Sequence, residues 1–463
     1  MNPLRIVRAQ VLPPAPHVAV AIVGAGACGL TAAIALREQG VACVLLERDA
    51  RPSGSTALSS GFIPAAGTRL QKSLDIEDSI QLFAEDIQAK AHGDAAPHLV
   101  QAYAQAVAQA IDALEQRHGI VFEVLDGFLY PGHRVRRMHA VPEHTGAALM
   151  ARLERAAGQA GADILTEALV RELWVGAADR VLGVAYERPD GALEYLACDA
   201  LVLACNGYGG NAAMVAELLP DMREAIFAGH KGNDGSAIAW GRQLGARLAD
   251  LGAYQGHGSW AIPQGALMSW AMMMEGGVQI NRDGARFHDE TQGYSEAAVH
   301  VLQQPGGIAW NVFDAPLLEM AQGFPDFVEA QKAGALRSAQ DVTALAQLIG
   351  CDATALHATL AAVRPGQPDH FGRDFRRVLG APYFAVKVTG ALFHTQGGLD
   401  IDARCRVLRA DGTPFPNLLA AGGAARGVSG NAVWGYLSGN GLLSAVGGGW
   451  IAAGTVAAQL AAG

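Results

Sequence analysis

The feature that most constrains the fold is a glycine-rich turn that joins an apolar strand to a helix near the start of the chain. Residues 18–23 are a β-branched run, and Gly24–Gly29, with the sequence GAGACG, follow at once. Apolar residues then recur at helical spacing over Leu30–Gln39, and a second apolar run over Val41–Leu46 stops at Glu47. This order predicts a strand, a tight loop, a helix and a second strand, which is the opening of a Rossmann-like α/β domain.

Each residue type in this loop has a mechanical reason. Gly24 permits the tight turn, Gly26 lets backbone N–H groups approach a pyrophosphate, and Gly29 allows close packing of helix on strand. Glu47 stands at the end of the second strand, where its carboxylate can accept hydrogen bonds from ribose hydroxyls. A tight turn without a ligand would not require this acidic residue, so the pattern predicts a dinucleotide site.

Composition excludes several other classes of protein. The 463 residues include 57 Gly but only 20 Pro, and 51% of them are hydrophobic, which is typical of a compact globular chain. The net charge is -10 and no basic cluster stands out, so we expect no nucleic-acid partner. The six Cys show no CxxC spacing, which favours reduced thiols in a cytoplasmic protein.

Two segments share features with membrane spans or export signals. The first residues carry Arg and then an apolar stretch, but that stretch is the strand, loop and helix described above, and we do not expect a secretory leader. Residues 427–463 contain no charged side chain, yet they are rich in Gly, Ala, Ser and Asn. We therefore expect a helix buried inside the protein and no membrane span.

The later segments favour FAD over NAD. Residues 51–61, RPSGSTALSSG, are small and polar, which suits a segment along a ribityl chain and the flavin edge. Asp163–Val170 and Asp199–Ala204 are predicted strands, and the second ends in the glycine-rich run CNGYGG. The run HKGNDG at 230–235 then opens another helix.

Together these segments resemble a known family. GAGACG with Glu47, SGSTALSSG, LACNGYGGN, GNDG, QGHGSW, GGVQINRDGARFHDE, HTQGGLDID and the glycine-rich tail are similar to those of the fumarate reductases, succinate dehydrogenase flavoprotein subunits and 3-ketosteroid dehydrogenases. The resemblance implies an α/β fold with a Rossmann-like FAD-binding domain in two sequence pieces and an inserted α+β capping domain over the isoalloxazine. The implied boundaries are an N-terminal extension at 1–14, FAD-binding pieces at 15–252 and 379–463, and a cap at 253–378.

The resemblance also implies which residues line the cofactor. Besides the loop glycines and Glu47 these are Ser55, Thr56, Gly61, Val170, Asn206, Asp234, Gly422, Gly441 and Leu442. Two departures from the family pattern matter. Gly423 stands where an acidic residue often follows Ala-Gly, and Pro52–Thr56 holds no His that could link the flavin, so noncovalent FAD is expected.

The residues expected around the flavin differ from those of a dicarboxylate enzyme. In the fumarate reductases, an Arg proton donor lies seven residues beyond the Phe of an Arg-Phe motif, and counting from Phe287 gives Tyr294. The tail Arg that would clamp a carboxylate is also missing, with Arg426 the nearest substitute. Guanidinium groups bind dicarboxylates through charge-assisted pairs, and the absence of Arg at these two positions argues against fumarate as the substrate.

Tyrosines at these positions resemble the 4,5-desaturating 3-ketosteroid dehydrogenases. Desaturation beside a ketone removes an α proton, stabilises the enolate oxygen and transfers a β hydride to the flavin. We expect Tyr436 to bind the carbonyl oxygen and Tyr294 or Ser438 to take the proton. Each tyrosine could instead be a core side chain, and Ser438 could instead cap the helix predicted over Leu442–Leu460.

Two histidines suggest an acid group on the substrate. His257 and His394 match positions that hold a substrate carboxylate in fumarate-reductase-like members, although either could be a structural histidine. A cyclic keto acid such as 4-oxocyclohexanecarboxylate would place its ketone at the tyrosines and its carboxylate at these histidines and Arg426.

Three hypotheses stay open: a ketone desaturase, a fumarate-reductase-like enoate reductase, and a flavin-binding protein without turnover or an oxidase that feeds a partner. The reduced flavin would pass its electrons to oxygen, a quinone or a separate carrier. The basic stretch 133–144, with three His and three Arg, is predicted to be a solvated or substrate-entry loop without metal. Helices are predicted over Ile76–Ala91, His98–Gln116, Val342–Leu348 and Ala353–Val363.

Overall fold

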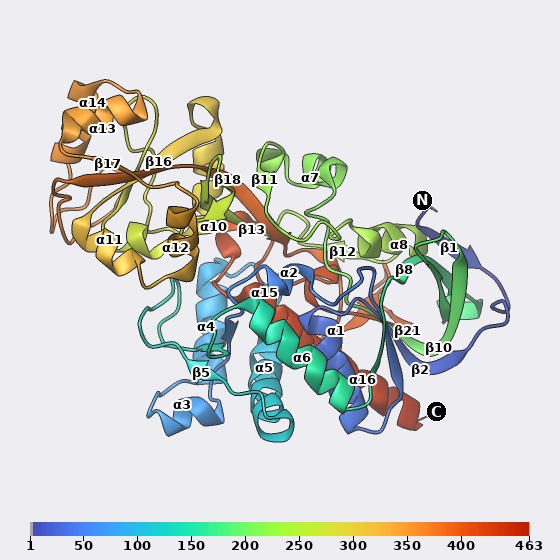
Figure 1. The fold of residues 1–463 in the computed structure, drawn as a ribbon. Helices are drawn as coiled ribbons and strands as arrows, with labels where there is room; N and C mark the ends of the chain where they lie inside the picture. Colours follow the sequence, from blue (N-terminus) through green and yellow to red (C-terminus); the bar gives the residue numbers. More distant parts are fainter. Residues whose placement is uncertain (1–2, 463) are drawn as a thin grey trace. The chain divides into compact units, whose positions relative to one another are not determined.

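The computed structural model describes residues 3–462, which form two compact units (Figure 1). The first unit contains the described residues up to Leu218, then Gly229–Tyr254, then His394 onward. The second contains Leu219–Ala228 and Gln255–Phe393. The chain therefore crosses between the units four times, and two of these crossings lie within the continuous strands Tyr254–Ala261 and Tyr383–Thr395.

A nine-stranded sheet is the centre of the first unit. Its main path runs β1-β8-β9-β10-β2-β3-β7, and β21 with β20 joins at β10. The strands are β1 Arg5–Arg8, β2 His17–Val23, β3 Cys43–Leu46, β7 Asp163–Leu165, β8 Leu169–Val175, β9 Val181–Glu187, β10 Leu193–Leu203, β20 Arg406–Leu408 and β21 Pro414–Ala420. Since β7, β3, β2, β10 and β21 are parallel neighbours, their carboxyl ends meet at one edge, where ligands of open α/β sheets bind.

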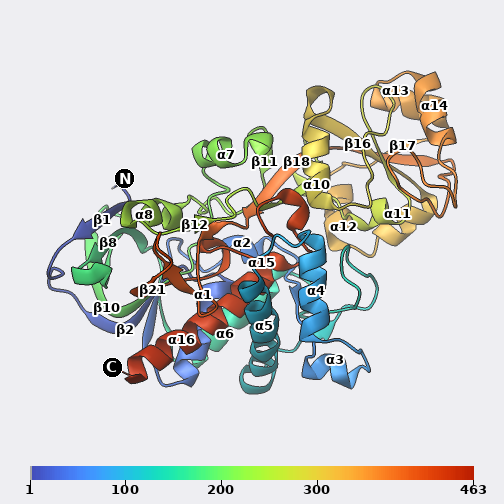
Figure 2. The ribbon, with the colours of Figure 1, turned by 180° about the vertical axis from the view of Figure 1, so that it is seen from behind.

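Helices cover this sheet, and in both views α16 runs alongside α1 (Figures 1 and 2). The helices of the first unit are α1 Ala27–Glu38, α2 Gly54–Ala57, α3 Arg69–Ser73, α4 Ile80–Lys90, α5 Pro97–His118, α6 Gly146–Gln159, α7 Ala212–Leu218, α8 Ser236–Leu244, α15 Asn440–Leu442 and α16 Gly448–Ala462. A π-helical turn, Leu443–Gly447, joins the last two. Short strands β4 Ile63–Pro64, β5 Glu123–Val124, β6 Met138–Ala140, β12 Leu248–Ala249 and β19 Gly398–Leu399 complete the unit.

The second unit has its own seven-stranded sheet and its own apolar core. Its strands are β11 Ile226–Phe227, β13 Tyr254–Ala261, β14 Ala266–Leu267, β15 Val278–Ile280, β16 Ile308–Asp314, β17 Arg337–Ala339 and β18 Tyr383–Thr395. Its helices are α9 Ala271–Met274, α10 Tyr294–Leu302, α11 Ala315–Ala321, α12 Pro325–Lys332, α13 Val342–Ile349 and α14 Ala353–Ala361. The fold is thus α/β, with a Rossmann-like unit in separate sequence pieces and an α+β unit inserted into it.

Most predicted elements are confirmed, and their ends have local causes. The predicted helix at 76–91 begins later, at Ile80, because the hydroxyl of Ser79 accepts the N–H of Leu82 and caps α4. The predicted strand Asp163–Val170 is two strands, β7 and β8, because Glu167 between them has a left-handed φ of 53°. Strand β1, which lies within the expected N-terminal extension, pairs with β8.

The prediction of a solvated or substrate-entry loop at 133–144 is wrong for its central part: Arg134 and Arg136 are exposed, whereas residues 137–141 are buried. Arg137 is 1% exposed, and His133 and His139 are buried with it. The guanidinium of Arg137 pairs with the carboxylates of Asp78 and Asp86, so its charge is compensated inside the protein.

One helical stretch in residues 3–462, Asn440–Ala462, is long and apolar enough to cross a membrane by length and composition. In its most apolar window 56% of the residues are buried inside the structure, as in the core helix of a globular unit. The absence of a membrane span stays an expectation.

Candidate active site

The glycine loop has the geometry of a phosphate cradle. Gly24 has a φ of 102°, and a Cβ there would lie 2.6 Å from the carbonyl oxygen of Ala204. A Cβ on Gly29 would lie 2.0 Å from the carbonyl oxygen of Gly24. These two glycines are therefore required by the fold of the loop itself.

Gly26 is different. Its φ is -74°, which any residue adopts, and no described atom lies within 4 Å of where its Cβ would be. Neither backbone strain nor packing explains a glycine at the start of α1. The space that a Cβ would fill lies at the N-terminal end of this helix, where a pyrophosphate binds through backbone N–H groups.

Glu47 stands directly beside this loop. One carboxylate oxygen accepts the N–H of Ala25 at 2.8 Å and the other accepts the N–H of Asp49 at 3.0 Å. The side chain is 6% exposed, and burial raises the pKa of its carboxyl. Glu47 thus links the loop to the end of β3, and its role in binding a ribose stays a prediction.

Three further predicted cofactor residues come together beyond the loop. The Oγ of Ser55 accepts hydrogen bonds from Asn206 at 3.1 Å and from Asn233 at 2.9 Å. Asp234, the neighbour of Asn233, pairs with Arg48 at 3.2 Å. Asn206 has a left-handed φ of 66°, which turns the chain away from the end of β10. Asn233 and Arg48 were not singled out from the sequence, because each becomes recognisable only through these long-range partners.

The other predicted cofactor residues lie in different parts of the first unit. Thr56 is buried in α2, and Gly61 lies against Gly146, since a Cβ on it would be 3.0 Å from that backbone. Val170 is buried in β8. Gly422, with a φ of 59°, packs against Cys28 of α1, which brings the tail of the chain to the glycine loop.

Tyr436 and His394 form one polar pair within the first unit. Their rings meet edge to face, with centroids 5.6 Å apart. A Cβ on Gly441 would lie 2.8 Å from Nε2 of His394 and 3.7 Å from the hydroxyl of Tyr436. The phenol, the imidazole and the Gly441-Leu442 backbone therefore share one small region.

Nδ1 of His394 has two polar neighbours. The amide nitrogen of Gln396 lies 3.1 Å from it and the backbone oxygen of Thr395 lies 3.4 Å from it, while the amide oxygen of Gln396 accepts from Ser429. Nε2 is the ring nitrogen that lies beside Gly441. Burial lowers the pKa of His394 to about 4, so the ring is neutral at physiological pH.

Tyr294 and His257 form a second pair, within the inserted unit. Their rings are stacked, with centroids 4.9 Å apart and planes 16° apart. Tyr294 is the first residue of α10, and Ser295 joins α10 to β13 through hydrogen bonds with Gly256. Nδ1 of His257 accepts the N–H of Ser259, so its proton also lies on Nε2.

Sequence comparison decides the family. A model of the FAD binding domain family matches residues 19–442. The chain belongs to this family. It is a flavoprotein, and FAD is its cofactor.

Two relatives and one solved structure show which flavoenzymes the chain is similar to. It is 28% identical over 420 residues to an NADH:fumarate oxidoreductase of Klebsiella pneumoniae (strain 342), which covers 89% of this chain but only 45% of that protein. It is 26% identical over 506 residues to a 4-oxocyclohexanecarboxylate 2-dehydrogenase of Sinomonas cyclohexanicum, covering 88% of this chain and 87% of that protein. The structure of 3-ketosteroid-delta4-(5alpha)-dehydrogenase from Rhodococcus jostii RHA1 has the same fold, with a TM-score of 0.78, 23% identity and coverage of 99% and 100%. The predicted FAD-dependent oxidoreductase family is confirmed, and the predicted likeness to fumarate reductases and ketosteroid dehydrogenases is found in these relatives and in the shared fold.

The cradle fits the cofactor of this flavoprotein. Gly26 leaves room for a phosphate, Glu47 presents a carboxylate at the end of β3, and Ser55 with Asn206 lies beside them in the first unit. Within residues 3–462, no group of three or more His, Cys, Asp or Glu is arranged to hold a metal ion.

Two predicted residues of the flavoprotein have environments that bear on their roles. Arg426 pairs with Asp250 at 2.6 Å and lies 3.6 Å from Asp400, so its charge is largely compensated. The cap of α15 is Gly439, which makes no side-chain capping bond. Gly439 thus occupies the N-cap position of α15, next to Ser438, and the role of Ser438 in the site stays a prediction.

The buried His257 makes the stability of the flavoprotein sensitive to acid. Burial lowers its pKa to about 3, against about 6.5 for an unfolded histidine. The neutral ring is favoured in the folded state, so its contribution is complete above about pH 6.5 and is lost as pH falls towards about 3. Between about pH 6.5 and about pH 3, protonation of His257 should cost the wild type about 1.4 kcal/mol of its free energy of unfolding for each pH unit. We expect His257→Phe to lack this contribution, so its free energy of unfolding should fall less steeply with falling pH. Urea unfolding at several pH values measures this, and equal slopes in the two proteins would contradict it.

Proposed function

We propose that this flavoprotein is a desaturase of cyclic ketones, which introduces a C=C bond α,β to the carbonyl, and that a small keto acid such as 4-oxocyclohexanecarboxylate is its substrate. The observation that carries the proposal is the Tyr436 phenol, 6% exposed, beside the neutral His394 and the Gly441 backbone. A neutral carbonyl is best bound by a phenol O–H and a backbone N–H, since a buried guanidinium would carry a desolvation cost.

The proposed roles follow from what each step requires. Tyr436 donates to the carbonyl oxygen and stabilises the negative charge that develops there when the α proton leaves. Tyr294 or Ser438 takes that proton. Bound FAD supplies the acceptor for the β hydride. Two C–H bonds break, one C=C bond forms, and oxygen, a quinone or a separate carrier later receives the two electrons.

The two histidines are proposed to bind the carboxylate of the substrate. His257 carries its proton on Nε2, and the neutral ring of His394 also has one N–H, so each offers one neutral N–H donor. Arg426 is proposed as a further donor. Because Asp250 and Asp400 already compensate its charge, we expect Arg426 to contribute less than either histidine.

The buried arginines of the inserted unit support a substrate without two carboxylates. Arg286 belongs to the Arg-Phe motif, and it pairs with Glu290 at 2.6 Å and with Asp369. Arg373 also pairs with Glu290 at 2.6 Å. Both guanidinium groups are paired with carboxylates in the core of this unit, so neither is available to bind a second substrate carboxylate.

An enoate reductase remains the second candidate. It is supported by the relative named NADH:fumarate oxidoreductase, which is 28% identical to this chain. Such an enzyme would run the opposite redox direction, with an unsaturated acid as the electron acceptor.

A substrate panel separates the two candidates. Under anaerobic conditions, we expect 4-oxocyclohexanecarboxylate to bleach the flavin absorbance. We expect cyclohexanone, the same ring without the carboxylate, to do so with a kcat/KM about 10- to 100-fold lower, since charge-assisted hydrogen bonds to the carboxylate are lost. An unchanged kcat/KM would refute the keto acid. Oxidation of reduced viologen by fumarate or acrylate, with no bleaching by any ketone, would favour the enoate reductase.

A further inference from the structure

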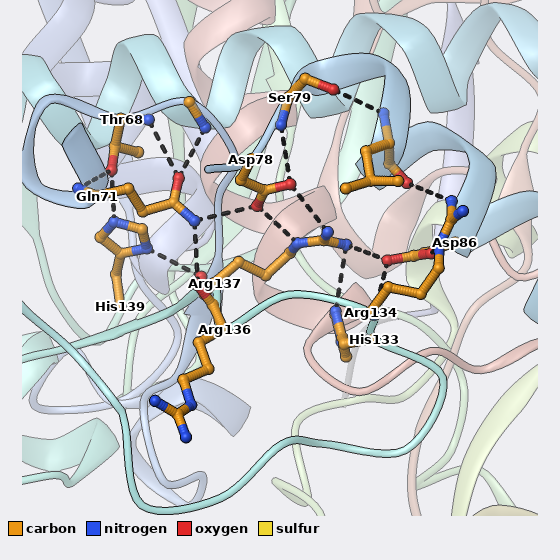
Figure 3. A network of polar contacts seen from close by, with 12 residues as sticks. Thr68, Gln71, Asp78, Ser79, Asp86, His133, Arg134, Arg136, Arg137 and His139 are labelled. Atoms are coloured by element: carbon orange, nitrogen blue, oxygen red, sulfur yellow. Dashed lines mark hydrogen bonds and ion pairs between the residues drawn. The ribbon is translucent and has the colours of Figure 1, made fainter. Parts of the chain in front are cut away.

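A buried polar cluster contacts the segment that carries Tyr436 and Ser438. We call it the Arg137 cluster, and it consists of Thr68, Gln71, Asp78, Asp86, His133, Arg137 and His139 (Figure 3). The guanidinium of Arg137 donates two hydrogen bonds to Asp78, at 2.9 and 3.0 Å, and one to Asp86 at 2.6 Å. Its centre lies 4.7 Å from the ring of Phe83. Such a fully paired buried charge holds its surroundings in one arrangement.

His133 connects this cluster to the active-site segment. Its Nε2 lies 2.9 Å from the backbone oxygen of Ser438, 305 residues away in the sequence. A carbonyl can only accept, so Nε2 carries the proton and donates it. Nδ1 is then unprotonated, and it faces Nη1 of Arg137 at 3.5 Å. Arg137 thereby favours the tautomer that the bond to Ser438 requires.

Gly132, next to His133, and the β4–β6 pair also pack closely against residues 437–439. A Cβ on Gly132 would lie 2.6 Å from Cδ1 of Leu437. A Cβ on Gly439 would lie 2.6 Å from Pro64 and 3.5 Å from Met138. Residues 437–439 are therefore held from two sides, by the backbone at 132 and by the β4–β6 pair.

We propose that His133 is a positioning residue, which fixes the Tyr436–Ser438 segment through its hydrogen bond to the Ser438 carbonyl while the Arg137 cluster fixes His133. The effect on catalysis rests on the function proposed above, whereas the effect on the segment does not. Burial and the nearby Arg137 lower the pKa of His133 to about 4, so the ring stays neutral, in agreement with this role. His133 does not need to touch the substrate.

The test compares His133→Phe with His133→Gln and His139→Phe in the FAD-bound protein. Gln can donate to the Ser438 carbonyl, whereas Phe keeps a ring against Phe83 but cannot donate. His139 is the matched control, because it is fully buried in the same cluster but bonds to Thr68 and to the Arg137 carbonyl. Hydrogen exchange of the Asn440 and Leu443 amides, which bond to Leu437 and Gly439, reports on the segment without any substrate.

We expect His133→Phe to speed this exchange about tenfold, the effect of one lost hydrogen bond, and His133→Gln to restore it. With a ketone that reduces the flavin, we expect His133→Phe to lower kcat about 10- to 100-fold at a nearly unchanged KM. His139→Phe should lower Tm but change exchange and kcat much less than His133→Phe does, because it keeps the bond from His133 to Ser438. Unchanged exchange in His133→Phe, or equal effects in His139→Phe, would overturn the proposal.

If His133→Phe does not fold, nitrogen NMR of the wild-type protein still decides the matter. A neutral His133 ring with its proton on Nε2 at neutral pH is expected. A proton on Nδ1 would overturn the proposal. Because neither exchange nor NMR needs turnover, a failure of the ketone activity would leave these results readable.

Discussion

Tyr436→Phe is expected to slow reduction of the flavin by a cyclic ketone about 100- to 1,000-fold, the usual cost of removing one preorganised donor to a developing oxyanion. The ring that packs edge to face on His394 is retained, so FAD content and Tm should stay close to those of the wild type. Stopped-flow absorbance under anaerobic conditions measures the rate, and the ratio of visible to ultraviolet absorbance measures the FAD content.

Tyr186→Phe is the matched control. Tyr186 has the same exposed fraction as Tyr436, 6%, but it lies in β9 of the central sheet. We expect its rate to stay within about twofold of the wild type, as for substitutions away from the reacting atoms. If Tyr294→Phe and Tyr436→Phe both leave the rate of flavin reduction intact, the proposed roles of the two tyrosines are wrong.

Gly26→Val is expected to abolish FAD binding while the protein still folds. A Cβ at this position would meet no described atom within 4 Å other than those of its chain neighbours, so the unfolding midpoint of the FAD-free protein should be nearly unchanged. The side chain would instead occupy the space of the pyrophosphate. Loss of two charge-assisted hydrogen bonds there corresponds to an affinity for FAD at least about 100-fold lower, which titration of the FAD-free protein with FAD measures.

Gly29→Ala provides the contrast for this prediction. Its Cβ would lie 2.0 Å from the carbonyl oxygen of Gly24, so the variant should lose stability with or without FAD. Normal FAD affinity in Gly26→Val would contradict the assignment of the loop as the phosphate cradle.

The sequence was sufficient where the determining interactions are local. The turn at Gly24 and the entry to α1 follow from residue types within one short stretch, and both are confirmed. The break at Glu167 is also local, but a left-handed residue other than Gly or Asn leaves no clear signal in the sequence. The single strand predicted over Asp163–Val170 is therefore two strands, β7 and β8, in the structure.

Long-range partners could not be predicted in the same way. The stretch that contains Arg137 looks solvated by composition, but Asp78 and Asp86, from another part of the chain, compensate the charge of Arg137 inside the protein. The bond from His133 to Ser438 spans 305 residues and has no pattern of its own. Ser438 resembles a helix cap in the sequence, yet the left-handed Gly439 takes that position.

The most direct test of the central claim, that a tyrosine-lined site desaturates a ketone, is product analysis after a single anaerobic turnover with 4-oxocyclohexanecarboxylate. The proposed function predicts one equivalent of the α,β-unsaturated keto acid, lighter by two hydrogens, for each flavin reduced. A flavin that no cyclic ketone reduces, but that returns electrons to an unsaturated acid once reduced, would contradict it.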